Sequence, residues 1–330
     1  MSESKRRRRG SADGAPVVPD VEFTSYYGRP VVKASPWEND IPAYLFLGGL
    51  AGASSLLAAG ADLSDRPALR RTGRVGALAG ISLSFAALVH DLGKPSRFLK
   101  MLRVAKPTSP MSTGTWILMA YGPAAGAAGA AELAGLLPRR LRWVGRLLGS
   151  AARPAGLGAA VLGPAVAAYT AVLLADTATP AWHEAYRELP FVFVGSAATA
   201  AGGLGMIGAP PGEAGPARRL AVSGAITELV AEQRMERSMG LAAEALHTGR
   251  AGTLSAASRA LTAAGTFAAL AARRSRIAAV AGGAALLAGS AATRFAIFEA
   301  GQASARDPKY TVVPQRERLA GRQRQRDPGA

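Results

Sequence analysis

His90 and Asp91 stand next to each other at the end of an apolar segment, where a membrane-spanning helix would meet water. An imidazole changes charge near neutral pH, so an imidazole beside a carboxylate is suited to passing protons across the membrane edge. The same segment is also typical of a helix end. Gly93 can adopt the left-handed conformation there, and the cations Lys94 and Arg97 complement the negative helix terminus. Both interpretations can hold together.

Asp176 is a second candidate for proton transfer. It ends another apolar segment and follows Tyr169 by seven residues, so the two side chains are expected near the same face of a helix, two turns apart. Asp176 would then relay a proton or bind a partner subunit. A solvated carboxylate at a helix end is the alternative interpretation.

Glu228 is a third candidate, because it follows an apolar run and an acidic residue inside a membrane bundle is commonly functional. Glu232 lies one turn further along the same predicted helix. We expect Glu232 to pair with an arginine, either Arg259 or Arg234. Glu228 is therefore the better candidate for a group in the membrane interior.

Long apolar helices must position these groups. Five segments run almost without charge, and about 20 such residues cross a hydrocarbon core. These segments are residues 41–61, 75–89, 116–137, 157–174 and 191–208. Residues 277–298 share the pattern except for Arg294, whose guanidinium can extend to the interface. Residues 220–235 and 254–272 carry more charge and complete a set of eight. The sequence thus predicts an all-α, polytopic membrane bundle of eight transmembrane helices.

The amino-acid composition limits both the kind of fold and the kinds of cofactor site that this chain can form. Alanine and glycine supply much of the 49% hydrophobic content, which favours a tightly packed bundle. A soluble helical protein is the alternative, but polar residues do not recur every three or four positions in the apolar segments. The absence of cysteine excludes cysteine-ligated iron–sulfur clusters, and the three histidines do not form the intramembrane pairs that bind two haems. We expect no haem, iron–sulfur cluster or metal on this chain.

Polar, basic tails flank the apolar region. We expect a disordered N-terminal tail at residues 1–36, a membrane domain at residues 37–300 and a disordered C-terminal tail at residues 301–330. The net charge of +17 and the basic run at residues 5–9 raise the possibility of nucleic-acid binding. No aromatic residue is interleaved with that run to stack on bases, so we expect no nucleic-acid partner.

Several ordered segments together resemble the NrfD/polysulfide-reductase membrane subunit family. They are WENDIPAYLFLGGLAGAS from Trp37, HDLGKPSRFLKML from His90, PTSPMSTGTWIL from Pro107, YTAVLLADTATPAW from Tyr169 and LPFVFVGSAATAAGG from Leu189. The segment ASARDPKYTVVPQRERL from Ala303 is similar to the ending of members encoded beside formate-dehydrogenase-like subunits. The resemblance spans most of residues 37–319.

The resemblance implies a quinone-interacting anchor of eight helices in the cell membrane. In this family the subunit itself carries no redox centre. A ferredoxin-like iron–sulfur subunit docks on it, and a molybdopterin-dependent catalytic subunit lies beyond. Electrons pass between the nearest cluster and an exchangeable quinone or menaquinone, and some members are thought to move protons as well. A polytopic transporter and a purely structural anchor are the alternatives that we consider.

Four residues fall at the quinone-contacting positions of the family motif: Asn39, Asp40, Tyr44 and Tyr169. Their side chains can donate or accept a hydrogen bond at a quinone oxygen. Some relatives have a histidine where this chain has Tyr44. Each residue also has a structural interpretation. Asn39 and Asp40 are suited to capping the first helix, Tyr44 to anchoring it at the interface, and Tyr169 to the core.

Five cations recur nearly every third position between the second and third apolar segments. They are Lys94, Arg97, Lys100, Arg103 and Lys106. On a helical stretch this spacing forms a basic stripe, suited to an acidic ferredoxin-like surface or to anionic lipid headgroups. The basic tails and the arginine-rich short loops favour opposite orientations in the membrane, so the orientation stays open.

Overall fold

The computed structural model describes residues 29–94, 96–136, 138 and 142–326, and the structural statements that follow concern these residues. They form eleven α-helices and no strand. The helices are α1 (Asp40–Leu63), α2 (Pro67–Asp91), α3 (Ser96–Met101), α4 (Pro110–Leu133), α5 (Arg142–Ala175), α6 (Pro180–Glu184), α7 (Leu189–Gly208), α8 (Gly215–Ser238), α9 (Gly249–Ala271), α10 (Arg276–Arg306) and α11 (Lys309–Arg326). Short 3₁₀ segments follow α4 and α8.

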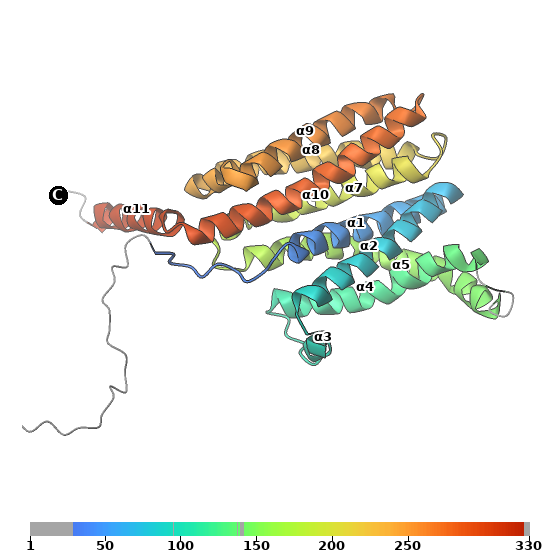
Figure 1. Ribbon diagram of the computed structural model, residues 1–330, viewed down its shortest axis with the longest axis horizontal. Coiled ribbons are helices and arrows are strands. Elements are labelled where there is room, and N and C mark those ends of the chain that lie inside the picture. The colour runs from blue at the N-terminus through green and yellow to red at the C-terminus, as the bar shows by residue number, and fades with distance from the viewer. Residues whose placement is uncertain (1–28, 95, 137, 139–141, 327–330) are drawn as a thin grey trace, which may run out of the picture.

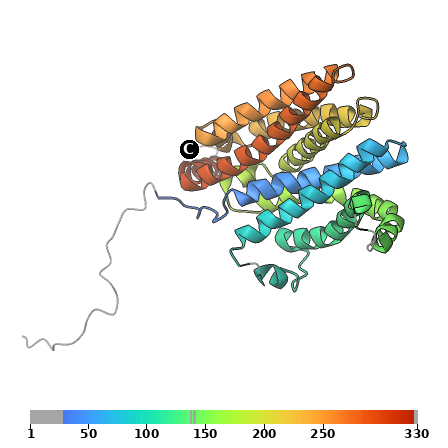
Figure 2. The same cartoon turned by 45° about the vertical axis from the view of Figure 1, so that its right-hand side comes forward.

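Eight long helices run roughly along one direction and form two groups (Figure 1). In the first group, α1 packs on α2 and α5, and α4 packs on α5. In the second, α7 packs on α8 and α10, and α9 packs on α10. Contacts between α1 and α7 join the two groups, which the turned view separates (Figure 2). The bundle is therefore built around α1 and α7.

Five of the long helices are long and apolar enough to cross a membrane. They are α1, α2, α7, α10 and residues 143–175 of α5. The other three, α4, α8 and α9, lie alongside them in the bundle. Each of the eight predicted apolar segments coincides with one long helix. The prediction of an all-helical membrane bundle is confirmed, and the number of eight spans stays a prediction.

Small residues allow the helices to approach closely, as the alanine- and glycine-rich composition predicts. Gly52 of α1 and Gly163 of α5 meet backbone to backbone, and a Cβ atom on either glycine would collide with the other's carbonyl. Gly203 of α7 and Gly283 of α10 make a similar contact. Close approach of this kind maximises dispersion contacts where no hydrophobic driving force acts between helices.

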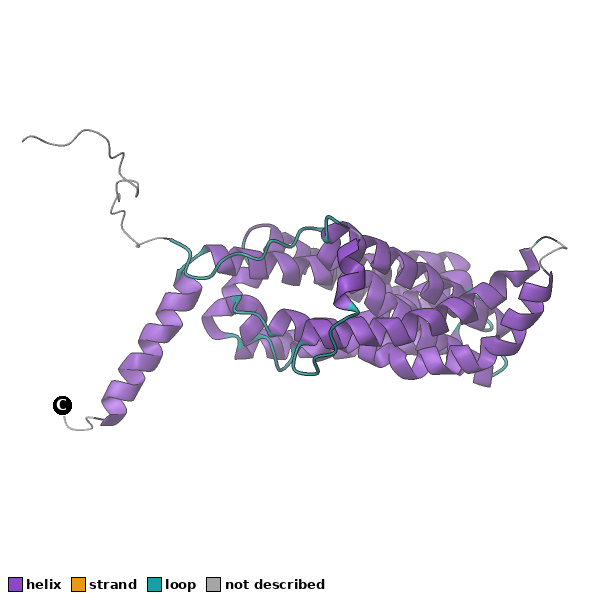
Figure 3. Ribbon diagram, turned by 90° about the horizontal axis from the view of Figure 1, so that it is seen from below, coloured by secondary structure: helices purple, strands orange, loops and turns teal. Residues whose placement is uncertain are grey.

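The C-terminal tail differs from the prediction of disorder. Helix α10 continues to Arg306, and α11 follows at an angle to the bundle (Figure 3). The Asp307 carboxylate accepts a hydrogen bond from the Lys309 amide at 2.9 Å, Lys309 pairs with Glu244 at 2.9 Å, and Tyr310 is buried. These contacts fix the first turn of α11, and the arginine and glutamine residues that follow are good helix formers. Residues 1–28 of the predicted N-terminal tail lie outside the described residues.

Candidate functional site

A cavity of about 210 Å³ lies between α1, α2, α4 and α5, at the end of the bundle where α1 begins. Tyr44, Asp91 and Tyr169 line it, so the fold brings together three of the predicted site residues from three different helices. Most of the remaining wall is apolar and includes Ile41, Leu88, Leu118 and Leu173. A mostly apolar cavity with a few polar groups is the usual form of a small-molecule site.

Tyr169 is the most informative residue of this cavity. Its side chain is 8% exposed, and its buried hydroxyl has no hydrogen-bond partner. Gly114 of α4 leaves the space that the ring occupies, because a Cβ atom there would collide with the ring. An unpaired buried hydroxyl costs roughly 1–3 kcal/mol. A ligand oxygen that accepts a hydrogen bond from this hydroxyl would recover part of that free energy. A core tyrosine whose hydroxyl is already hydrogen-bonded to the protein would not need such a ligand.

Tyr44 faces the same cavity from α1 and is 4% exposed. Its carbonyl oxygen accepts a hydrogen bond from the Ser84 hydroxyl of α2 at 3.1 Å. This bond fixes the spacing of α1 and α2 beside the cavity. The burial of Tyr44 is deeper than an interfacial aromatic anchor requires.

An ion pair joins α1 and α2 directly beside the lining residues Ile41 and Asp91, and we call this edge the cavity mouth. His90 Nδ1 lies 2.7 Å from Asp40 Oδ2, and the His90 side chain is 80% exposed. The sequence places His90 beside Asp91, and in the structure its hydrogen-bond partner is Asp40 of α1. Gly93 has a φ of +66°, which confirms the left-handed residue predicted after α2. Arg97 also lines the cavity, and it donates to the Leu92 carbonyl at 3.3 Å.

Asn39 and Asp176, like Asp40, His90 and Glu228, lie outside this cavity wall. Asn39 is exposed and precedes α1 without a side-chain capping bond, so it does not act as the predicted cap. Asp176 is exposed and directly follows α5, about two turns beyond Tyr169. Neither lines the cavity.

Glu228 belongs to a separate polar region between α8 and α10. It is 1% exposed, and its Oε1 accepts a hydrogen bond from the Thr293 hydroxyl at 2.7 Å. The Thr293 and Ser258 hydroxyls lie 2.6 Å apart. Glu228 Oε2 is buried without a hydrogen-bond partner. A carboxylate is thus present inside the bundle, at the position that the sequence indicated.

Arg294 lies in the same region, and the prediction that it extends to the interface is wrong. It is 1% exposed, donates to the Phe193 carbonyl at 2.6 Å and stacks over the Phe193 ring at 3.8 Å. The Phe193 carbonyl and ring satisfy part of the guanidinium inside the bundle, whereas its Nε and Nη1 atoms are buried without a hydrogen-bond partner. Sequence reasoning missed this contact because Phe193 precedes Arg294 by 101 residues.

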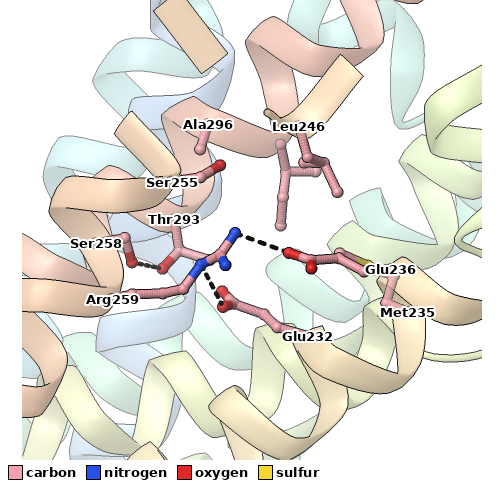
Figure 4. A pocket seen from close by; sticks show the side chains of 10 residues that line it. Glu232, Met235, Glu236, Leu246, Ser255, Ser258, Arg259, Thr293 and Ala296 are labelled. Carbon is pink, nitrogen blue, oxygen red and sulfur yellow. Dashed lines mark hydrogen bonds and ion pairs between the residues drawn. The ribbon is translucent and has the colours of Figure 1, made fainter. Parts of the chain in front are cut away.

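A cavity of about 10 Å³ lies beside Thr293, large enough for about one water molecule (Figure 4). Arg259 lies between two carboxylates there, 2.7 Å from Glu236 and 4.0 Å from Glu232. The prediction that Glu232 pairs with Arg259 is therefore confirmed. Glu236 also lies 3.5 Å from the half-exposed His247. Polar groups thus extend from Glu228 toward the surface.

Comparison with known proteins identifies the family. The family model described as "Polysulphide reductase, NrfD" matches residues 31–230, which is more than half of the chain and includes α1 to most of α8. No curated protein matches the chain. The resemblance to the NrfD family is confirmed over residues 31–230, and the chain belongs to this family of membrane subunits, which generally anchor molybdoenzyme complexes.

Proposed function

We propose that this protein is the quinone-interacting membrane subunit of a molybdopterin and iron–sulfur oxidoreductase complex in the cytoplasmic membrane. The observation that carries the proposal is the buried, unpartnered hydroxyl of Tyr169 in a mostly apolar cavity. A quinone needs such a combination, because its ring favours apolar walls and its carbonyl oxygen needs a hydrogen-bond donor. Quinone or menaquinone would be an exchangeable ligand.

A bound quinone would supply two-electron, two-proton redox chemistry. The residues of this chain bind and orient the ligand and exchange protons. The Tyr169 hydroxyl donates a hydrogen bond to the ligand oxygen, and Tyr44 and the apolar wall hold the ring. Asp91 lines the cavity, and Asp40 and His90 lie at its mouth, so these groups can exchange protons between the cavity and water. Asn39 and Asp176 would act at the surface around that mouth.

The exposed basic residues beside the cavity mouth support a docking role. Lys94, Lys100, Arg103 and Lys106 are all exposed, on and around α3. A ferredoxin-like iron–sulfur subunit with an acidic surface would bind there by charge complementarity and bring its nearest cluster close to the cavity.

The catalytic molybdopterin subunit would lie beyond it. Formate is the substrate that we propose for that subunit, on the resemblance of residues 303–319. Residues 37–300 would form the quinone-interacting domain.

The test is Tyr169→Phe in the assembled complex. Loss of one hydrogen bond to the ligand should lower kcat/KM for quinone about 2- to 10-fold. The thermal midpoint should stay unchanged or rise, because the hydroxyl has no protein partner.

Tyr121→Phe is the matched control. The Tyr121 hydroxyl is buried and lies 2.8 Å from the Ser55 hydroxyl. Its removal should cost about 1 kcal/mol of stability without affecting quinone turnover. If both variants lost stability and neither lost turnover, Tyr169 would be an ordinary core residue and the proposed pocket would be wrong.

A second role, movement of protons through the bundle, is favoured by the Glu228 region. Glu228 Oε2 is unpartnered, and the Thr293 and Ser258 hydroxyls link Oε1 to the water-sized cavity beside Glu232 and Glu236. Hydroxyls and water can pass protons along such a series, and a buried carboxylate can hold one in transit.

Glu228→Gln tests this role, because the amide keeps a polar contact with Thr293 but cannot ionise. Reconstituted complexes should retain quinone affinity and lose proton translocation measured with a pH-sensitive dye in the vesicle lumen. Glu244→Gln, an exposed carboxylate on the 3₁₀ segment after α8, is the control. Unchanged translocation by the Glu228 variant would exclude the route.

A further inference from the structure

A groove of about 620 Å³ lies between α8 and α9, at the end of the bundle opposite the tyrosine cavity. Helix α8 packs mainly on α7 and α9 mainly on α10, which leaves the groove between them open. Arg218 and Arg219 enter it from the first turn of α8, and Arg273 enters it from the turn after α9. Three arginines from two segments of the chain thus line the same groove.

These three cations have no acidic partner in the part of the chain that the structure describes. Arg218 donates only to the Pro211 carbonyl, at 3.3 Å, and Arg219 and Arg273 lie close enough to repel it. The nearest acidic residue in sequence, Glu213, is engaged elsewhere, because its carboxylate accepts hydrogen bonds from the Ala68 and Leu69 amides at 2.7 and 3.2 Å. The mouth of the groove therefore carries uncompensated positive charge.

The neighbouring Arg276, at the same end of the bundle, is an arginine whose guanidinium is hydrogen-bonded within the protein. Its guanidinium donates to the carbonyls of Met206, Ile207 and Ala209 at the C-terminal end of α7. Arg276 thus caps the C-terminal end of α7. Arg219 and Arg273 have no such internal role, so an anion from outside would be their first strong partner.

The groove becomes apolar toward the middle of the bundle. Val222, Ile226 and Leu270 line it after the arginines, and Ile226 and Leu270 are 58% and 64% exposed. Phe267, one turn before Leu270, is 73% exposed. Large apolar side chains on a membrane protein surface face acyl chains. A ligand that fits the whole groove therefore has a negative head at the bundle end and an apolar chain toward the middle.

We propose that this groove is a specific site for an anionic membrane phospholipid, with its phosphodiester held by Arg218, Arg219 and Arg273 and an acyl chain along Val222, Ile226 and Leu270. Guanidinium groups match phosphate oxygens as paired donors, and basic pockets between membrane helices bind anionic headgroups. A zwitterionic phospholipid would bring its own cation to the three arginines. The site should therefore prefer phosphatidylglycerol or cardiolipin to phosphatidylcholine. This inference does not depend on the quinone proposal.

The experiment is native mass spectrometry of the full-length protein, with any subunits that co-purify, after exchange into nanodiscs of phosphatidylcholine containing a small fraction of phosphatidylglycerol. One phosphatidylglycerol should remain bound when the bulk lipid is removed. The triple variant Arg218→Gln, Arg219→Gln, Arg273→Gln should weaken this retention by about tenfold or more, since each of the three cations contributes roughly fivefold to anionic-lipid binding.

Two controls separate this site from general basicity. The triple variant Arg316→Gln, Arg318→Gln, Arg322→Gln removes the same charge from α11 and should retain the lipid. Ser223→Phe places a ring in the groove without changing charge, since Ser223 lines it and is exposed. It should expel the acyl chain and release the lipid.

Three results would overturn the proposal. They are equal retention of phosphatidylcholine, retention of phosphatidylglycerol by the groove variants, and complete displacement of the lipid by millimolar inorganic phosphate. The last result would indicate a site for free phosphate in place of a lipid headgroup.

Discussion

The two ends of the α1, α2, α4 and α5 group use polar residues in opposite ways. At one end, the Tyr169 hydroxyl is buried without a partner beside an open cavity. At the other end, the mostly buried Arg74 lies 2.9 Å from Glu132 and 3.5 Å from the mostly buried Asp62. Arg70 adds a 2.9 Å contact to Glu132.

This difference distinguishes a candidate binding site from a cluster of ion pairs that holds the helices together. Both ends carry buried polar groups from several helices, so residue type alone does not distinguish them. At the Arg74 end, opposite charges on α1, α2 and α4 pair with one another and hold the helices together, although Arg74 Nε and Asp62 Oδ2 make no hydrogen bond. At the Tyr169 end, a hydrogen-bonding group and a volume are left for something else. Breaking the first should cost stability, and altering the second should cost binding.

The largest expected effect is on the Arg74 end. Arg74→Met would leave Glu132 and Asp62 mostly buried near one remaining inner arginine, so we expect a loss of about 3–5 kcal/mol. Thermal unfolding in detergent would measure it. Arg153→Gln is the control, because Arg153 contacts Asp62 at 3.5 Å but its side chain is 69% exposed. Its cost should stay below about 1 kcal/mol. Equally small losses of stability in both variants would contradict a structural role for the Arg74 ion pairs.

An intermediate effect is expected at Gly114, which makes room for the Tyr169 ring. In Gly114→Ala the methyl group would push the ring into the cavity, with a stability cost of about 1–3 kcal/mol and a several-fold rise in KM for quinone. Gly126→Ala on the same helix meets no atom within 4 Å. It should stabilise the protein by about 0.5–1 kcal/mol and leave KM unchanged. A higher KM in both variants would remove the link to the ring.

The smallest structural effect is expected at the cavity mouth. His90→Gln breaks an exposed ion pair, so the thermal midpoint should not move measurably. Quinone turnover should fall by less than about tenfold, because Asp91 can still exchange protons at the cavity. The double variant with Asp91→Asn should lose more. Full activity in the double variant would show that protons reach the cavity by another route, and Glu244→Gln, which breaks an exposed ion pair with Lys309, serves as the distant control.

The sequence predicts the helices well because a run of about 20 apolar residues has few alternatives in a membrane. The family resemblance groups Tyr44 with Tyr169, whereas Asp91 is a separate proton-transfer candidate, and only the structure places all three on one cavity. The partners that it misses are tertiary. The Phe193 carbonyl and ring that satisfy Arg294, and the Asp40 carboxylate that pairs with His90, lie on other helices. No local pattern specifies which helix ends will meet.

Helix α11 shows a different limit. Its residues are so polar that composition indicated a disordered tail, whereas the helix begins where Asp307, Glu244 and the buried Tyr310 fix its first turn. Local helix propensity becomes decisive once such a nucleus exists, because starting a helix costs more than extending one. Composition averages over a segment and does not register a nucleus of three residues.

The backbone contact between Gly52 and Gly163 limits how the tyrosine cavity can open. Tyr44 lies eight residues from Gly52 and Tyr169 six residues from Gly163, about 12 and 9 Å along their helices. This contact holds α1 and α5 at a fixed separation, so the two walls of the cavity cannot move apart without breaking it. A carrier molecule must enter by turning aside side chains of α2 and α4. Its exchange rate should then follow side-chain rotation and remain insensitive to stretching or thinning of the surrounding bilayer.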